Sequence, residues 1–153
     1  MLLPSGINDG SSSKKNEAEL TPKPLDLKQM TVKGACQVLG KAYFRLTQAP
    51  DPAEVRPEEI LQQSLKLMSK KWKKRQADYR YIDEQFRSMR QDLTVQRIQN
   101  PLAVKIYETH ARIALEMADL DQFNQCQTQL HYMYKKKIEG NYVVSALHNQ
   151  IIF

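Results

Sequence analysis

The stretch with the clearest chemical potential is the basic run Lys70-Lys-Trp-Lys-Lys-Arg75. Three interpretations are open for it: a solvated cationic helix end, a nuclear-import signal, or a contact for nucleic-acid phosphate. In the third case affinity would depend on salt and carry little sequence preference, and the contacting residues would be Lys70, Lys71, Lys73, Lys74 and Arg75. Trp72 continues an apolar stripe, so we expect it in the core rather than stacked on a base.

The positive charge of the chain is concentrated around this run. The formal net charge is +6, and residues 66–97 carry ten basic against four acidic side chains, so the whole excess lies in that basic segment. Charges within a Debye length of about 8–10 Å reinforce one another, which makes a concentrated excess a better target for polyanions than a scattered one. The alternative interpretation is a solvated helix face without a ligand.

The other chemistry-bearing residues form no recognisable catalytic or metal-binding pattern. The five glycines are not spaced as a phosphate loop, and the three histidines have no partner at metal-ligand spacing. We expect His110 to be a hydrogen-bonded packing residue and Cys126 to be an inert thiol on a buried stripe. The sequence therefore predicts a protein without catalytic activity, cofactor, metal ion or small-molecule substrate.

Apolar residues at three- and four-residue steps predict the helices that would position these groups. The expected helices cover residues 32–46, 57–75, 79–89, 101–117 and 119–135. In the fourth helix, one face should hold Ala103, Ile106, Tyr107, His110, Ala114 and Met117. Because a short turn makes neighbouring helices antiparallel, residues 101–135 should form a helical hairpin. The predicted fold class is all-α, a tetratricopeptide-like stack of helical hairpins.

Helix boundaries are indicated by residues that cap helices. Asn100, followed by Pro101, and Asp119 are expected N-caps. The stretch RQDLTVQRI, residues 90–98, is a poor helix interior because Asp and Thr compete for backbone hydrogen bonds. We therefore expect Asp92 or Thr94 to cap a short helix there, at a structural corner of the fold.

Composition divides the chain into three parts. Residues 1–31 are rich in Ser, Lys, Pro and Asn and predict a disordered tail. Residues 32–134 carry the helical patterns, and residues 135–153 form a tail of different character. The absence of any apolar run of about 18 residues argues against a membrane span. Two distant cysteines favour a reducing, intracellular compartment.

Seven motifs in residues 32–134 carry a resemblance to a known family. They are Val32-x-Gly34-x-Cys36-Gln37, Tyr43-x-Arg45-Leu46-Thr47, Ala49-Pro50-Asp51-Pro52, Val55-Arg56-Pro57, Ser88-x-Arg90-Gln-Asp-Leu-Thr-Val-Gln96, Tyr107-Glu-Thr-His-Ala-Arg-Ile-Ala-Leu-Glu116 and Phe123-Asn-Gln-Cys-Gln-Thr-Gln-Leu130. In combination they resemble the SAC/GANP/THP family of nuclear messenger-RNA factors, closest to its leukocyte-receptor-cluster member-eight branch.

This resemblance implies the N-terminal, helical part of a PCI-like domain, which in relatives continues into a winged helix. It also implies a non-catalytic nuclear scaffold for mRNA processing, transcription elongation or mRNA export. The partners implied by the resemblance are a second PCI protein and a small acidic subunit. RNA contact through residues 66–97 is expected separately, from the concentration of basic side chains in that segment. The residues expected to build the structural corner and the helix caps are Arg90, Asp92, Thr94, Gln96, Asn100 and Asp119.

The sequence departs from the family pattern at about Lys135. We therefore expect a C-terminally truncated isoform that lacks the winged helix. Two alternatives stay open beside the scaffold: a generic helical protein–protein adaptor without a nucleic-acid role, and an inactive truncated isoform.

Overall fold

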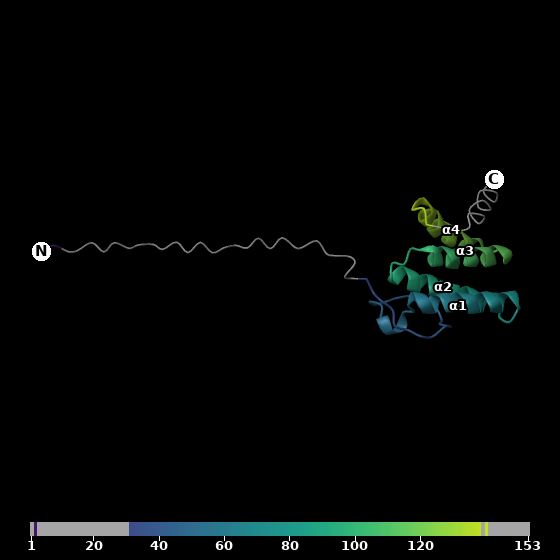
Figure 1. The fold of residues 1–153 in the computed structure, drawn as a ribbon, viewed down its shortest axis with the longest axis horizontal. Coiled ribbons are helices and arrows are strands. Elements are labelled where there is room, and N and C mark those ends of the chain that lie inside the picture. The colour runs from purple at the N-terminus through teal and green to yellow at the C-terminus, as the bar shows by residue number, and fades with distance from the viewer. Residues whose placement is uncertain (1, 3–30, 139, 141–153) are drawn as a thin grey trace.

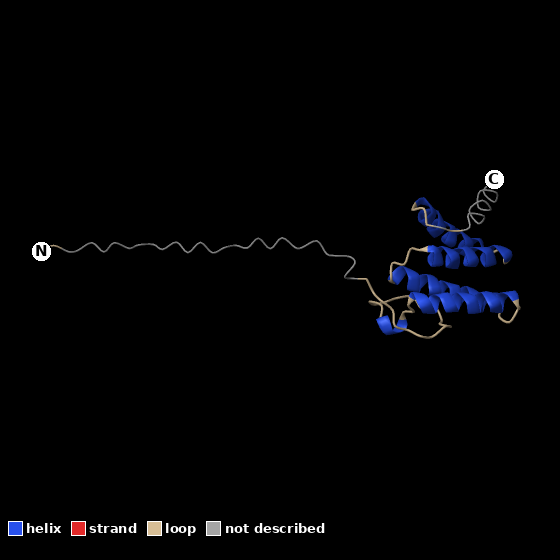
Figure 2. Cartoon of the chain, in the orientation of Figure 1, coloured by secondary structure: helices blue, strands red, loops and turns tan. Residues whose placement is uncertain are grey.

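A computed structural model describes residues 2, 31–138 and 140 of the 153-residue chain. Its elements are a short 3₁₀ turn and four helices: η1 Pro52–Glu54, α1 Glu58–Lys73, α2 Tyr79–Val95, α3 Pro101–Glu116 and α4 Leu120–Lys135. The described part contains helices and loops only (Figure 2). The expected all-α class is therefore confirmed. Within those residues, every helix is too short or too polar to cross a membrane.

The helices run back and forth and form a stack (Figure 1). α1 pairs with α2, α3 packs against both of them, and α4 covers the far side of α3. Between the last residue of α3 and the first of α4 there are only three residues, so these helices form the predicted hairpin. The non-helical chain that precedes α1 lies beside the α1–α2 pair.

Side-chain caps begin three of the four helices. Asp78, Asn100 and Asp119 each accept a hydrogen bond from the backbone amide three residues later, at 2.9, 3.0 and 3.1 Å. Each bond satisfies an amide that has no partner inside its helix. α1 starts differently, because Pro57 occupies the N-cap position and Glu58 is the first helical residue. The predicted start at Pro57 is one residue early.

The apolar faces of the helices meet in one core. α1 contributes the predicted stripe of Ile60, Leu61, Leu65, Met68 and Trp72, and α2 adds Ile82, Phe86, Met89 and Leu93. Met117 is a correction, because it is 46% exposed instead of lying on the buried face of α3. α3 ends at Glu116, so Met117 begins the turn and no longer follows the rotation of the helix.

Residues 32–46 are not helical, contrary to expectation. The amide of Ala35 donates to the carbonyl oxygen of Pro52 at 2.9 Å. A Cβ atom at Gly34 would overlap the backbone carbonyl of Val55. Backbone amides of the segment thus donate to η1 and its flanks and to the side chains of Gln85 and Gln96. These tertiary contacts replace the local bonds that a helix would need, which is why helical spacing misled here.

A buried ionic network holds this segment against α2. Arg56 is fully buried, and its Nε donates to Oδ2 of Asp92 at 2.6 Å, while Lys41 Nζ lies 2.7 Å from Oδ1 of the same carboxylate. Gln96 adds two bonds, donating to the carbonyl of Arg56 at 2.7 Å and accepting from the amide of Gly34 at 3.0 Å. The buried charges are therefore paired, as burial requires.

The expectation that Asp92 or Thr94 caps a short helix is wrong. α2 continues to Val95 with both residues inside it. The carboxylate of Asp92 does not compete for helix amides because Arg56 and Lys41 already engage it. The Thr94 hydroxyl donates to the carbonyl one turn earlier at 2.9 Å. The corner comes after the helix, at Arg97, whose φ of 55° lies in the left-handed region.

Two expectations fall almost entirely on residues that the structure does not describe. The disordered tail concerns residues 1–31, of which residues 1 and 3–30 are outside the described set. The divergent tail and the missing winged helix concern residues 135–153, of which 139 and 141–153 are outside it. The division into three parts stays a prediction.

Candidate functional site

An open groove of about 530 Å³ lies between α1 and α3. Its apolar lining consists of Leu65, Trp72 and Ile113, which are buried members of the core. The lining also includes six exposed basic side chains: Lys66, Lys70, Lys73, Lys74, Lys105 and Arg112. Ser69, Thr109 and Glu116 make up the rest. We call this feature the α1/α3 groove.

The electrostatics of the α1/α3 groove are almost entirely positive. Glu116 is the one acidic residue in the lining, and its Oε2 accepts a hydrogen bond from the indole nitrogen of Trp72 at 3.1 Å. Within residues 31–138, none of the six basic groups forms an ion pair with a carboxylate. A cleft lined by charges of one sign focuses the field and attracts ligands of the opposite sign. The groove is therefore suited to a polyanion.

The five residues that the sequence predicts as phosphate contacts do not all lie in the same site. Three of them line the groove: Lys70, Lys73 and Lys74. Lys71 lies against α2, with Nζ 3.5 Å from the hydroxyl of Tyr81 and 5.1 Å from the centre of its ring. Arg75 follows α1 and places its guanidinium 5.2 Å from the centre of the Trp72 ring.

Lys105 and Arg112 line the groove from α3, and sequence analysis missed both of them. They lie outside the basic segment, in a part of the chain with balanced charge. Their separation of seven residues places them on the same helix face two turns apart, which is the one local signal they carry. That this face lies beside the lysines of α1 follows only from the tertiary structure.

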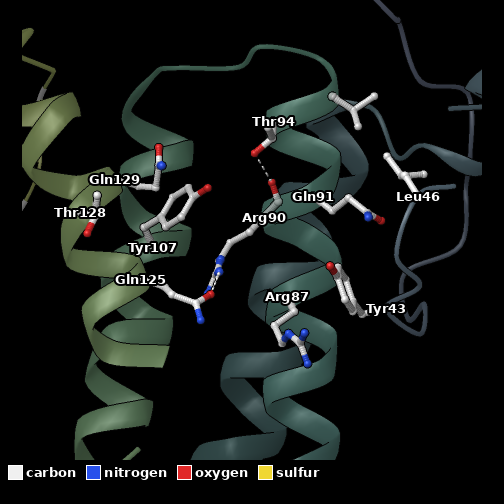
Figure 3. A pocket seen from close by; sticks show the side chains of 11 residues that line it. Tyr43, Leu46, Arg87, Arg90, Gln91, Thr94, Tyr107, Gln125, Thr128 and Gln129 are labelled. Atoms are coloured by element: carbon white, nitrogen blue, oxygen red, sulfur yellow. Dashed lines mark hydrogen bonds between the residues drawn. The ribbon is translucent and has the colours of Figure 1, made fainter. Parts of the chain in front are cut away.

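Two arginines of the basic segment serve internal contacts. Arg87 holds its guanidinium 4.3 Å from the centre of the Tyr43 ring. Arg90 reaches from α2 toward α4, where its Nη1 lies 3.1 Å from Oε1 of Gln122 and its Nη2 lies 3.2 Å from Oε1 of Gln125 (Figure 3). The charge excess of residues 66–97 is therefore only partly available to a ligand.

A second groove, of about 480 Å³, lies between α2 and α4 and is also lined by the segment before α1 (Figure 3). Its lining is mainly polar and includes Arg87, Arg90 and Tyr107. Since both arginines already contact other side chains of the protein, this groove offers less uncommitted positive charge than the α1/α3 groove.

His110 is a buried, hydrogen-bonded packing residue, as the sequence predicts. Its Nε2 lies 2.8 Å from Oδ1 of Asp83, and its Nδ1 lies 3.1 Å from Nη1 of Arg90. Because arginine can only donate, Nδ1 accepts and Nε2 carries the proton toward Asp83. Burial lowers the pKa of His110 and outweighs the opposing effect of Asp83. The His110–Asp83 contact is therefore a hydrogen bond of a neutral ring rather than an ion pair.

Cys126 lies next to this cluster, with Sγ 3.3 Å from Nη1 of Arg90. Burial raises the pKa of the Cys126 thiol to about 11, so the unreactive, protonated form prevails at neutral pH. Among the described residues no three His, Cys, Asp or Glu side chains gather closely enough to hold a metal ion. The cluster thus lacks an activated nucleophile beside a free base.

A protein-family model described as the SAC3/GANP family matches residues 16–151. This chain belongs to the SAC3/GANP family. A THP3 homolog from Schizosaccharomyces pombe is 48% identical over 136 residues, which are 89% of this chain and 33% of that protein. Protein THP3 from Saccharomyces cerevisiae is 48% identical over 108 residues, 71% of this chain and 23% of that protein.

The leukocyte receptor cluster member 8 homolog from Xenopus laevis is 48% identical over 117 residues, which are 76% of this chain and 14% of that protein. The resemblance that the motifs indicate is thus confirmed. The SAC3/GANP chain spans a third or less of the length of these relatives.

The motifs that carry the SAC3/GANP resemblance map onto the framework more than onto the groove. Gly34, Arg56, Asp92 and Gln96 all belong to the buried network, whereas residues 58–87, which include α1, lie in none of the seven motifs. Among the basic residues of the groove, only Arg112 falls inside a motif. The motifs therefore give little information about what the groove binds.

Proposed function

We propose that this chain is the helical part of a non-catalytic nuclear scaffold linked to mRNA processing, transcription elongation or mRNA export. It acts by binding, and it contacts RNA through the basic segment, residues 66–97. Membership of the SAC3/GANP family supports the link to mRNA. One observation carries the RNA contact: three exposed lysines without a carboxylate partner in residues 31–138 stand together on α1, namely Lys70, Lys73 and Lys74.

The scaffold role is supported by how the buried polar groups are used. Asp83 and Arg90 of α2 both contact His110 of α3, and Arg90 also donates to Gln122 of α4. Arg56 and Asp92 join the N-terminal segment to α2. These groups hold the helices together. The outer helix faces remain for protein partners, which by resemblance are a second PCI-type protein and a small acidic subunit.

A nuclear location is supported by the family and by the run Lys70–Arg75, whose composition is also that of an import signal. Import and RNA contact would use the same exposed lysines. They are separable, because RNA binding is measured with purified protein and import is measured in cells.

A generic helical adaptor is the second candidate function, and a specific observation favours it. Lys71, Arg87 and Arg90 contact side chains of this same chain, so part of the basic segment is structural. In this alternative the remaining lysines form a solvated rim, and protein partners bind independently of RNA.

The test is RNA binding by the purified 153-residue chain across a salt series, beside the variant Lys73→Glu/Lys74→Glu/Arg75→Glu. We expect steeply salt-dependent binding by the wild type and a flatter, weaker response from the variant, because the counterions released on binding reflect the phosphates contacted. Circular dichroism of both proteins checks that the helices are intact. If the wild type does not bind RNA, or if both proteins bind equally, the RNA contact through this segment is wrong and the adaptor gains support.

A further inference from the structure

The basic residues of the α1/α3 groove form two rows along helices that are not neighbours in the sequence. On α1 the row runs from Lys66 to Lys74, which at 1.5 Å per residue spans about 12 Å. On α3 it runs from Lys105 to Arg112 and spans about 10 Å. The two rows line the same groove over comparable lengths, with apolar side chains also in the lining.

Two sets of cations in the described part of the chain differ in what they contact. Arg56, Lys41 and Arg90 are committed to carboxylates or to acceptors inside the fold. The six basic residues of the groove are exposed, and no carboxylate of residues 31–138 pairs with them. The one acidic residue in the lining, Glu116, already accepts the indole proton of Trp72. A bound anion is therefore what would neutralise this surface.

We propose that the α1/α3 groove binds the sugar-phosphate backbone of single-stranded RNA, with Lys105 and Arg112 as part of the site. This inference rests on the proposed function and narrows it. RNA is held in a groove built from α1 and α3, rather than along the whole of residues 66–97. The α2 portion of that segment does not contribute, because Arg87 and Arg90 are engaged elsewhere and Arg80 is not part of the groove lining.

The side-chain types favour a single strand over other polyanions. Lysines are point charges on flexible stems, so they follow phosphates of variable spacing without reading bases. Leu65, Trp72 and Ile113 are buried members of the core, so the groove offers bases little apolar surface, and the preference for a single strand rests on the flexible lysines. An acidic peptide would satisfy the same charges, and the competition experiment below distinguishes it from RNA.

The experiment measures binding of a fluorescent single-stranded oligo-uridine to the purified 153-residue chain over a salt series. The test variant is Lys105→Ala/Arg112→Ala, which removes two cations outside the basic segment. The matched control is Arg80→Ala/Arg97→Ala, which removes two exposed cations inside that segment but away from the groove lining. Circular dichroism and thermal unfolding check that each variant keeps the fold.

We expect the test variant to bind several-fold more weakly and the magnitude of its slope of log K against log salt to fall by about 1.4, since a single strand loses about 0.7 per phosphate contact. The control should match the wild type. If both variants lose RNA affinity equally, the groove is not the binding site, and RNA is attracted diffusely by the basic segment. If only the Lys73→Glu/Lys74→Glu/Arg75→Glu variant loses binding, the proposed function stands and the two-helix groove is wrong.

Two competitors test the class of ligand. An RNA duplex of the same length should displace the oligo-uridine less well than an unlabelled single strand, and stronger displacement by the duplex would overturn the single-strand assignment. Poly-glutamate at equal charge should also compete weakly. If it competes as well as RNA, the groove is a site for an acidic protein. A wild-type chain that binds no RNA at all would overturn both this inference and the RNA contact in the proposed function.

Discussion

Arg56 Nε lies 2.6 Å from Asp92 Oδ2, and neither side chain has appreciable contact with solvent. The two residues are 36 positions apart and join the chain just before α1 to the last turn of α2. The other guanidinium nitrogens of Arg56 donate to the carbonyl of Leu39 at 2.9 Å and to the hydroxyl of Ser88 at 2.8 Å. This pair therefore ties the non-helical N-terminal segment to α2.

Replacing Asp92 with alanine should lower the free energy of unfolding by about 3–5 kcal/mol, because it leaves the buried charge of Arg56 without its partner. Urea denaturation followed by circular dichroism measures the change. Glu84→Ala is a matched control on the same helix: Glu84 forms no ion pair within the described residues, so its replacement should change the stability by no more than about 0.5 kcal/mol. Equal effects in the two variants would show that the pair does not hold the segment.

Gly34→Ala should destabilise the protein by about 1–3 kcal/mol, because the added methyl group overlaps the carbonyl of Val55 and forces the backbone to shift. Gly40→Ala is the control, since the nearest atoms to a Cβ there are at ordinary contact distances of 3.6 Å and beyond. Thermal unfolding of the two variants distinguishes them. A Gly34 variant as stable as the Gly40 variant would mean that the segment does not pack against η1 as described.

Ala118→Gly should raise the stability by about 0.5–1 kcal/mol. Ala118 has a φ of 55°, a left-handed conformation that costs a non-glycine residue about 1–2 kcal/mol. Glycine relieves this strain, but its extra conformational freedom in the unfolded chain offsets about 0.5–1 kcal/mol of the relief. Ala111→Gly, in the buried middle of α3, should instead destabilise by about 1 kcal/mol or more. A loss of stability on changing Ala118 would contradict the turn geometry between α3 and α4.

Stability should decrease as the pH falls below about 6.5, the ordinary pKa of histidine. His110 has a lowered pKa in the folded protein because it is buried, so in this window the unfolded chain binds a proton that the folded chain does not. The loss continues until the pH reaches the folded-state pKa. Denaturant unfolding at several pH values measures the slope.

A His110→Asn variant should show a flatter pH profile in that window. His131 is exposed on α4, so His131→Asn is the matched control and should keep the wild-type slope. A wild-type profile without decline between pH 6.5 and 5 would contradict the buried, neutral state of the ring and its bond to Asp83.

Much of the fold could be predicted from the sequence because its signals are local. Asn100 and Asp119 are bonded to amides three residues away, and the stripe from Ile60 to Trp72 follows from the helical repeat alone. For residues 32–46 the same helical periodicity gave a wrong prediction. Their spacing is compatible with a helix, but bonds to η1 and its flanks, together with the close contact of Gly34, hold them in another conformation.

Local sequence signals also led to the wrong prediction that Asp92 caps a helix. An aspartate inside a helix is unfavourable by propensity, and nothing nearby in the sequence shows that Arg56 and Lys41 lie on either side of its carboxylate. That long-range pairing engages the Asp92 carboxylate, and α2 continues past it to Val95.

By itself, the sequence determined the helical character and approximate positions of α1, α3 and α4 and of most of α2, the family, and the concentration of positive charge in residues 66–97. Only the tertiary structure decided which of those charges are available. It commits Arg87 and Arg90 to internal contacts, and it places Lys105 and Arg112 beside the lysines of α1. The physical reason is that helical periodicity and capping act within a few residues, whereas a groove between α1 and α3 depends on how distant helices pack.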